Sequence, residues 1–280
     1  MTQPMRQVDI QEDEWEDDLS HPLEKLNVSE EEYWEKYYEN SDIKCEWNNG
    51  YLEEKPMTDP ASYLMFEWFT DVLKFFLKTN PIGITMGLEF GFRLALPYKT
   101  TIRKPDMAVI LNNNPIRLSM NDRSFSGVFD VCVESLSDSK PQEIIRDVMI
   151  KKEEYERIGV KEYYILDAKG KNTAFYKRRN QRYVPIPIKK NIIQSQVLPG
   201  FQFRISDLWD RPTLEKMVED EVYRGFVVPF YQEEKKRAEH ERQRAEHETQ
   251  RAEQAERQLE QERHLSESLR LMLKNLGIEI

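Results

Sequence analysis

Residues 129–140, FDVCVESLSDSK, decide the fold class because they combine a core strand with an ionisable group. Phe129, Val131 and Val133 recur at every second position, which is the period of a β-strand. Glu134 then appears where the strand should still be half buried. A carboxylate in such a position is costly to desolvate unless a cation, a metal or backbone donors meet it. The stretch therefore predicts a strand with a polar site at its end.

Other runs of the sequence carry clear helix and strand patterns. Ser29 followed by Glu32 is typical of a helix N-terminus, and Asn49-Gly50 predicts a hairpin within residues 44–56. A helix, several strands, a second helix and further strands indicate an α/β or α+β core with one central sheet. The helix-like runs are residues 61–81 and 141–160, and the strand-like runs are 83–97, 105–111, 127–136, 161–167 and 172–186.

The composition indicates that part of the 280-residue chain lies outside a core, since only 39% of residues are apolar and 33% are charged. Residues 1–28 are acidic and polar, which predicts a disordered arm. The net charge of -10 hides a basic region at residues 140–190, where bases outnumber acids about two to one. That region is equally compatible with a polyanion-binding patch and with solvated helix faces.

Cysteine and histidine positions exclude several classes of site. Cys45 and Cys132 are far apart, which argues against a disulfide framework and is expected in a reducing cytoplasm. All four histidines fall in the acidic arm or in the charged tail, which argues against Ser-His-Asp chemistry and His-ligated zinc in the core. The sequence shows neither a signal peptide nor a membrane span.

The C-terminal part has a different character, because residues 235–262 repeat nearly every seven positions. This repeat predicts a long charged helix that forms a coiled coil, and so a homo-oligomer, near its C-terminus. A single helix stabilised by solvent remains the alternative. The predicted seam runs through Ala238, Ala245, Ala252, Leu259, Ser266, Leu273 and Ile280.

Two acids mark the candidate site. Asp106 and Glu134 lie on successive strand-like runs, and if those strands are neighbours the two carboxylates converge on a hard oxygen site suited to Mg²⁺ or Mn²⁺. The alternative is that Asp106 caps a turn while Glu134 pairs with Arg103 or Lys104. A positive group beside such a metal would orient the attacking water or stabilise phosphate charge. Lys151, on the following helix, is the candidate for that role unless it is simply solvated.

Four strings together resemble the restriction-endonuclease-like family called Uma-two, of the PD-(D/E)XK nuclease superfamily. They are IRKPDMAVI, FDVCVESLSDSK, RDVMIKKEEYERIGVKEYYILD and VLPGFQFRISDLW. The resemblance covers roughly residues 29–210, and the charged tail is also similar to tails of other members. It implies a central mixed sheet flanked by helices, with an arm at residues 1–28, a nuclease-like domain at 29–210 and a helical linker and coiled coil at 211–280.

The resemblance also implies an activity and its residues. A member of this family is expected to be an endonuclease that hydrolyses DNA phosphodiester bonds with Mg²⁺, with Asp106 and Glu134 as metal ligands. Leu136 occupies the position of the usual superfamily lysine, but the family places its lysine on the next helix in an Asp-x-x-x-Lys spacing, which Asp147 and Lys151 satisfy. Glu46, ahead of a glycine, matches a further family carboxylate and is a candidate metal ligand.

Further positions are weaker guides to function. Asp167 also matches the family, although a structural role in a turn is favoured over a catalytic one. The basic run YKRRNQR at residues 176–182 is a candidate grip for DNA phosphates, unless it is an exposed hairpin. The candidate DNA contacts are Lys152, Arg178, Arg179 and Arg182. The alternative function is a catalytically silent nuclease-fold module that binds DNA or acts as a scaffold, assembled through its coiled-coil tail.

Overall fold

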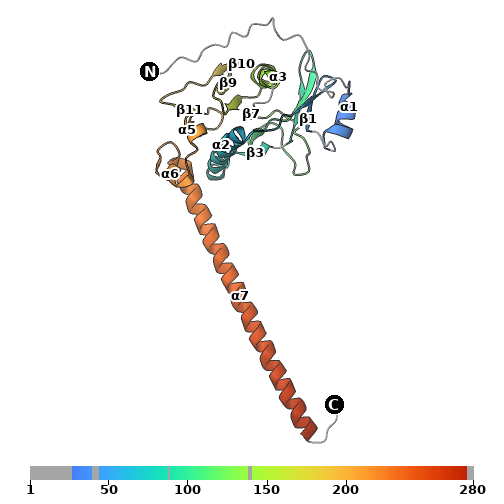
Figure 1. Ribbon diagram of the computed structural model, residues 1–280, viewed down its shortest axis with the longest axis vertical. Helices are drawn as coiled ribbons and strands as arrows, with labels where there is room; N and C mark the ends of the chain where they lie inside the picture. The colour runs from blue at the N-terminus through green and yellow to red at the C-terminus, as the bar shows by residue number, and fades with distance from the viewer. Residues whose placement is uncertain (1–26, 40–43, 88, 138–140, 276–280) are drawn as a thin grey trace. The chain divides into compact units, whose positions relative to one another are not determined.

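The computed structural model describes residues 27–39, 44–87, 89–137 and 141–275. The chain divides into one compact unit that ends at Pro212 and a second that begins at Thr213 (Figure 1). Val28, the last residue of the predicted disordered arm, is only 3% exposed and packs in a core cluster. The packed chain therefore starts before residue 29, and residues 1–26 of the predicted arm lie outside the described residues.

A four-stranded antiparallel sheet holds the N-terminal part of the first unit, in the order β2-β1-β5-β4. Its strands are β1 (Cys45–Asn48), β2 (Tyr51–Glu54), β4 (Phe92–Ala95) and β5 (Thr100–Arg103). The predicted hairpin is confirmed, since Asn49 and Gly50 join β1 to β2 with positive φ angles of 48° and 103°. Before it, Ser29 caps α1 (Glu30–Glu32), which continues as the π-helix η3 (Tyr33–Tyr37).

A six-stranded sheet forms the centre of the first unit, in the order β10-β9-β8-β7-β6-β3. It is mixed, because β7 and β8 are parallel while the other neighbours are antiparallel. Its strands are β3 (Gly83–Gly87), β6 (Met107–Leu111), β7 (Val131–Leu136), β8 (Glu162–Asp167), β9 (Ala174–Arg179) and β10 (Arg182–Pro185). A small sheet pairs β11 (Ile192–Gln194) with β12 (Gln202–Arg204), and the short helix α5 (Asp207–Asp210) follows it.

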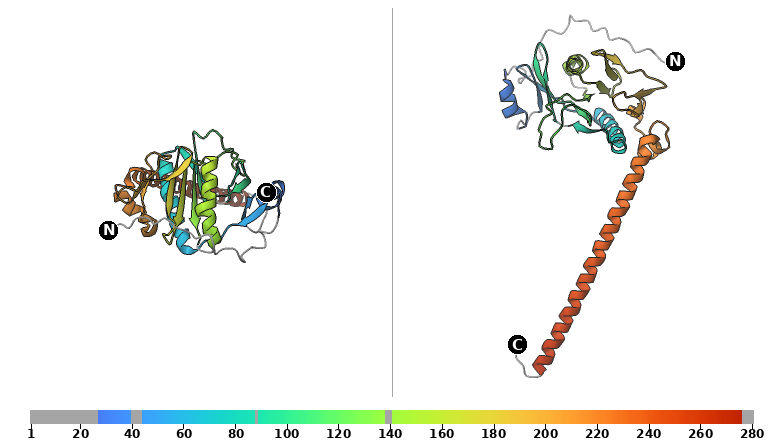
Figure 2. Two further views of the ribbon diagram at one scale, coloured as in Figure 1. Left: turned by 90° about the horizontal axis from the view of Figure 1, so that it is seen from above. Right: turned by 180° about the vertical axis from the view of Figure 1, so that it is seen from behind.

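Helices cover both faces of the six-stranded sheet (Figure 2). On one face lies α2 (Pro60–Thr79), which begins at Asp59, whose carboxylate accepts from the Ala61 and Ser62 amides. On the other lies a continuous segment of α3 (Pro141–Ile145), the π-helix η4 (Arg146–Lys151) and α4 (Lys152–Ile158). It ends at Gly159 with a φ of 105°, as a helix stop at glycine predicts. The α/β fold class is thus confirmed.

The predicted central mixed sheet is confirmed as the six-stranded sheet, but the described residues also form two further sheets that the sequence did not predict. The predicted strand at residues 83–97 is two strands, β3 and β4, which belong to different sheets. The chain turns between them at Glu89, which has a φ of 69° and so leaves the extended conformation. The strand β5 escaped prediction because its sequence, TTIR, is short and ends in a charged residue, although that residue is buried.

The second unit contains α6 (Leu214–Glu219) and α7 (Arg224–Asn275). The predicted long charged helix is present, with Pro229 inside it. Its side chains from residue 233 onward are almost all exposed wherever they are described. Exposed pairs such as Arg242 with Glu239 and Glu246 run along it at helical spacing. In the part of the chain that the structure describes, no helix is both long and apolar enough to cross a bilayer.

Candidate active site

Asp106 and Glu134 lie opposite each other, as the strand pattern predicts. The strands β6 and β7 are antiparallel neighbours, with Met107 paired to Val133. The same register continued by one residue places Asp106 across from Glu134. The Asp106 Oδ2 atom accepts a hydrogen bond of 2.8 Å from the Ser135 amide, directly after Glu134. The pairing of β6 with β7 therefore brings together two residues that a long loop separates in the sequence. Both carboxylates lie at the same end of the sheet.

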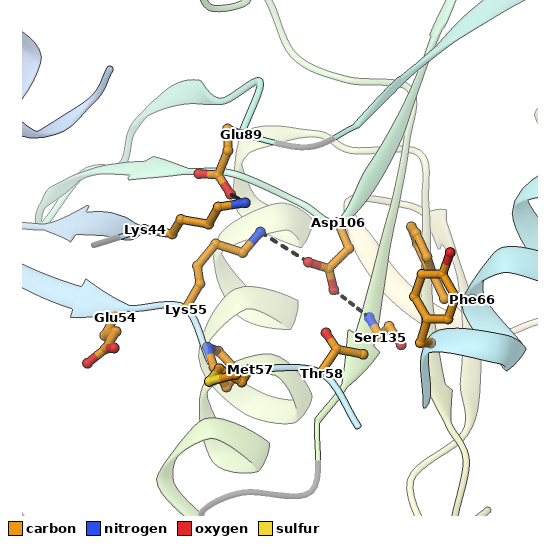
Figure 3. A pocket seen from close by; sticks show the side chains of 11 residues that line it. Lys44, Glu54, Lys55, Met57, Thr58, Phe66, Glu89, Asp106 and Ser135 are labelled. Carbon is orange, nitrogen blue, oxygen red and sulfur yellow. Dashed lines mark hydrogen bonds and ion pairs between the residues drawn. The ribbon is translucent and has the colours of Figure 1, made fainter. Parts of the chain in front are cut away.

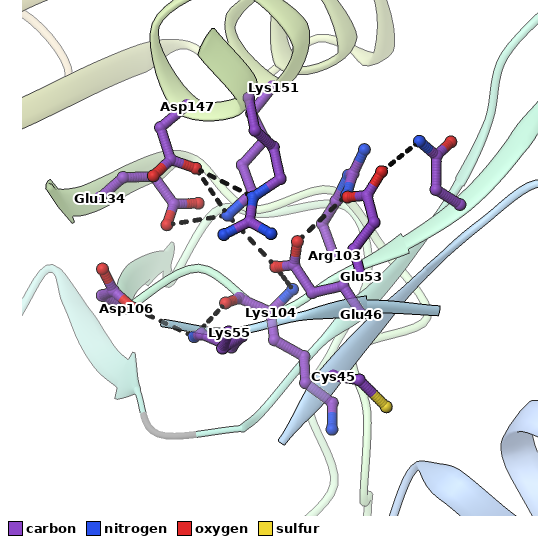
Figure 4. Close-up of polar contacts among 12 residues, drawn as sticks. Cys45, Glu46, Glu53, Lys55, Arg103, Lys104, Asp106, Glu134, Asp147 and Lys151 are labelled. Carbon is purple, nitrogen blue, oxygen red and sulfur yellow. Dashed lines mark hydrogen bonds and ion pairs between the residues drawn. The ribbon is translucent and has the colours of Figure 1, made fainter. Parts of the chain in front are cut away.

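Lys151 reaches this end of the sheet from the π-helix η4 (Figure 4). Its ammonium nitrogen lies 3.1 Å from Glu134 Oε2, 3.0 Å from Asp147 Oδ1 and 3.3 Å from Glu46 Oε1. The Lys151 side chain is only 2% exposed, so it is not the solvated helix lysine of the alternative interpretation. The Asp-x-x-x-Lys spacing places both side chains in the same cluster, and the structure brings Asp147, Lys151, Glu46 and Glu134 together.

Arg103 is a second buried cation beside Lys151, and the sequence had suggested it only as an alternative partner of Glu134. Its guanidinium binds Glu154 through two hydrogen bonds of 2.6 and 2.9 Å, Glu46 at 3.1 Å, and Glu53. Glu134 pairs with neither Arg103 nor Lys104, contrary to the alternative pairing. It instead accepts a hydrogen bond of 2.8 Å from the Tyr155 hydroxyl in addition to its contact with Lys151.

One signal in the sequence favours a cation beside this hairpin, and the structure identifies that cation as Arg103. The predicted hairpin turn at Asn49-Gly50 fixes a register in which Glu46 faces Glu53 directly. Two like charges directly opposite each other destabilise a strand pair. A hairpin that carries such a pair therefore requires a cation between the two carboxylates, and Arg103, on the adjacent strand β5, supplies it.

The surroundings of this cluster shift the pKa values of its two central carboxyl groups, Glu134 and Glu46, in opposite directions. Burial raises the pKa of Glu134 to about 8, assisted by the negative charges of Asp106, Asp147 and Glu46 and opposed by Lys151. Burial also acts to raise the pKa of Glu46, but Lys151 and Arg103 outweigh it and hold that pKa well below the usual range. For Lys151 the opposing effect of burial is exceeded by the surrounding carboxylates, so its pKa is raised. The lysine remains charged, and Glu134 is the group that titrates.

Asp106 connects the buried cluster to solvent. Its side chain is 27% exposed and lines a pocket of about 510 Å³ (Figure 3), whereas Glu134 and Lys151 are buried and do not line that pocket. The Asp106 Oδ1 atom lies 3.0 Å from the ammonium nitrogen of Lys55, which also donates to the Lys104 carbonyl at 2.8 Å. Lys55 follows the hairpin strand β2, and nothing in its local sequence marked it as part of the site.

The donor set fits a hard divalent cation bound by few protein ligands. Among the described residues, no group of three or more acidic, histidine or cysteine side chains is arranged to hold a metal. Mg²⁺ is usually bound through one or two carboxylates, with water and substrate phosphate completing its shell. Asp106 and Glu134 match that description. The oxygens of Glu46 contact Arg103, the Lys104 amide and Lys151, and those of Glu134 contact Tyr155 and Lys151. Of these three carboxylates, only Asp106 lines the pocket.

The remaining predicted residues lie apart from this cluster. Asp167 closes a turn, because its carboxylate accepts from the amides of Lys169 and Asn172. The candidate DNA contacts are on α4, on the edge strand β10 and on its neighbour β9. Lys152 stacks on Tyr176, Arg178 donates to the Glu156 carbonyl, Arg182 pairs with the Glu156 carboxylate, and Arg179 is exposed.

Comparison with known families gives this geometry a context. Residues 30–206 match the Uma2 family, which is described as "Putative restriction endonuclease". The chain belongs to the Uma2 family. A search of curated proteins found no match. The Uma2 region includes Asp106, Glu134 and Lys151, while the helix α7 lies outside it.

A solved structure supports the fold of this Uma2 chain. It is a protein from Anabaena variabilis ATCC 29413, described as a putative nuclease belonging to DUF820. The two sequences are 16% identical, the TM-score is 0.50, and the match covers 65% of this chain and 97% of the other. At that identity the likeness concerns the fold alone, and it confirms a nuclease-like arrangement of sheets and helices.

Proposed function

We propose that this Uma2 protein is a divalent-metal-dependent endonuclease that hydrolyses phosphodiester bonds of DNA. The observation that carries the proposal is the convergence of three side chains: Asp106 faces Glu134 across two strands, and Lys151 lies 3.1 Å from Glu134. The family and the fold of the solved neighbour support a nuclease as the class of enzyme. The pocket that opens at Asp106 gives a substrate access to this end of the sheet.

Asp106, on the pocket wall, and the buried Glu134 would hold Mg²⁺ or Mn²⁺. When bound, such an ion polarises the scissile phosphate and lowers the pKa of a bound water. The protein's own contribution is to fix the ligands. The Ser135 amide and Lys55 orient Asp106, while the Tyr155 hydroxyl and Lys151 orient Glu134.

Lys151 also keeps a positive charge at the site. Its neighbours Glu46 and Asp147 hold the ammonium in place and keep it protonated. A fixed cation in a buried, low-dielectric position stabilises the negative charge that builds on a phosphate during hydrolysis. The proposed reaction is direct attack by water, which needs no covalent intermediate.

Cleavage of supercoiled plasmid tests the proposal. We expect nicking or linearisation by the purified protein with Mg²⁺ or Mn²⁺ and none with EDTA. Asp106→Asn, Glu134→Gln and Lys151→Met should each lower the cleavage rate by about 100-fold or more, as loss of a transition-state contact does. Asp71→Asn and Lys74→Met, on exposed positions of α2, are the matched controls and should cleave as the wild type does.

Unchanged cleavage in all three site variants would reject the assignment. Calorimetric titration with Mn²⁺ separates the proposed enzyme from a catalytically silent scaffold. The wild type should bind the ion and Asp106→Asn should not. Absence of binding by the wild type would favour the scaffold, which would use the fold without its chemistry.

Two further proposals concern the substrate grip and assembly. Exposed Arg179, with Lys152, Arg178 and Arg182, is proposed to contact DNA phosphates along the edge of the six-stranded sheet.

The helix α7 is proposed to form a homo-oligomer through a seam that includes Leu259, which is 51% exposed. Sedimentation should show a dimer for the wild type and a monomer for Leu259→Glu, whereas Gln258→Glu should remain dimeric. The two buried, unpaired cysteines are consistent with function in a reducing cytoplasm.

A further inference from the structure

We infer that the pocket beside Asp106 binds an unpaired nucleobase, so that the enzyme acts on single-stranded or locally unpaired DNA. This inference rests on the proposed nuclease function and adds the form of the substrate. Its basis is the unusual composition of the pocket wall. Charged groups and exposed apolar groups meet around one carboxylate. A nucleotide would match this wall, because it has a charged phosphate at one end and the π-face of a base at the other.

The apolar part of the wall comes from the loop after β2 and from the first turns of α2. Met57, Tyr63 and Phe66 line the pocket, with Met57 91% exposed and Tyr63 51% exposed. Tyr63 and Phe66 are three residues apart on one helix and therefore lie on the same side of it. Aromatic side chains that remain open to solvent beside a polar site are a platform on which a base can stack.

The polar part of the wall lies on the other side of Asp106. Figure 3 shows Lys44 and Lys55 across Asp106 from Phe66. Lys55 reaches Asp106, and Lys44 lies 3.6 Å from Glu89. The pocket wall holds three acids, Glu54, Glu89 and Asp106, against these two lysines. A phosphate therefore requires further positive charge to enter, which a divalent ion at Asp106 would provide.

The size of the pocket suits one nucleotide and not a stacked base pair. About 510 Å³ is within the range of pockets that enclose a small ligand. A base can fill it only after leaving its stack, and that step is cheapest for a nucleotide that is already unpaired. With the phosphate at Asp106, the base of the same or the adjacent nucleotide reaches the Tyr63 and Phe66 side of the pocket. A perfect duplex should bind more weakly, because one of its bases must first leave the stack.

Binding of labelled oligonucleotides tests the inference without requiring cleavage. Fluorescence anisotropy with Ca²⁺ in place of Mg²⁺ would compare three DNAs: a single strand, a duplex with one unpaired nucleotide, and a perfect duplex. We expect the first two to bind more tightly than the third. Tyr63→Ala should weaken their binding about ten-fold, the size expected for loss of one stacked base, with little effect on the perfect duplex.

Two variants of α2 serve as controls. Tyr63→Phe keeps the ring and should retain the preference for unpaired DNA. Leu64→Ala removes a neighbouring apolar side chain that is 44% exposed and does not line the pocket, and it should change nothing. Because Tyr63 and Leu64 are both exposed, the fold should tolerate these changes, which circular dichroism would check.

The outcomes separate this inference from the proposed function. Equal affinity for the three DNAs, or an equal loss for all of them in Tyr63→Ala, would overturn the base pocket even if plasmid is cleaved. A Tyr63-dependent preference for unpaired DNA would support the pocket even in a protein that shows no cleavage. Both results together, cleavage and a preference lost in Tyr63→Ala, would support the nuclease and its substrate form.

Discussion

Two regions of this molecule are rich in charge, and they use it in opposite ways. Around Arg103 and Lys151 the charged groups are buried, and each cation touches at least three carboxylates. Along α7 the charged groups are exposed and pair with partners three or four residues away. Both regions consist mainly of acids, Lys and Arg, but the buried cluster gathers these residues from distant parts of the chain.

The difference shows that burial, and not the number of charges, decides what an ion pair does. A buried charge that loses its partner retains the full cost of desolvation. An exposed charge that loses its partner is solvated by water and loses almost nothing. The buried cluster therefore fixes the geometry of a site, while the exposed pairs make a helix soluble and leave its assembly to a few apolar residues.

Removal of Arg103 should have the largest effect and tests the comparison most directly. Arg103→Met leaves Glu46, Glu53 and Glu154 without their shared cation, so the free energy of unfolding should fall by about 3–5 kcal/mol. Urea denaturation followed by circular dichroism measures the change. The control is Arg93→Met, whose exposed pair with Glu30 should cost less than about 1 kcal/mol. Equal losses in the two variants would show that the cluster is not organised around Arg103.

A second test uses the titration of Glu134 in the metal-free protein. Its pKa is raised from 4.5 to about 8 by burial and neighbouring carboxylates, so the folded state keeps a proton that the unfolded state releases. The resulting stability is complete below about pH 4.5 and is lost as the pH rises to about 8, at up to about 1.4 kcal/mol per pH unit.

Glu134→Gln cannot titrate and should lack this loss. Urea denaturation in EDTA at several pH values would give the difference in stability between the wild type and the variant. That difference should fall from pH 4.5 to pH 8. A constant difference over this range would show that Glu134 is ionised throughout and that Lys151 alone balances it.

The smallest effect is expected on α7. Arg242→Ala removes an exposed cation, 67% accessible, from its contacts with Glu239 and Glu246. The free energy of unfolding should change by less than about 0.5 kcal/mol, because water replaces the partner. A loss of more than about 1 kcal/mol would place this pair in an interface and not in solvent.

The contrast between buried and exposed charges also explains which residues of the site could be predicted from the sequence. Asp106, Glu134 and Lys151 were found because each sits in a regular pattern, at a strand end or at a fixed helical spacing. Arg103 and Lys55 sit at the ends of short strands, and their partners are about 50 residues away. The sequence suggested Arg103 only as a partner of Glu134 and did not single out Lys55. The register of the sheets is needed to show which carboxylates surround them.

For the fold, the sequence predicted the long elements but not the pairing of the short strands. Long periodic elements such as α2 and β7 appear where the sequence places them, since their apolar faces are unambiguous. The division into three sheets was missed because it depends on which strands pair, and four-residue strands carry too few alternations to specify a partner. The contact of Glu46 with the buried cations likewise could not be predicted without the pairing of β1 with β5.

The π-helix η4 makes the location of the site sensitive to the length of the chain. Arg146, Asp147 and Lys151 are all buried, although Arg146 and Lys151 are five residues apart. In an α-helix two such residues would point about 140° away from each other. A π-helical turn accommodates one additional residue, and such turns are frequent at functional sites. Deletion of a single exposed residue here, such as Met149, would thus leave a helix of normal appearance whose lysine no longer faces the carboxylates. In an alignment, a gap of one position in this helix would distinguish chains that retain the site from chains that retain only the fold.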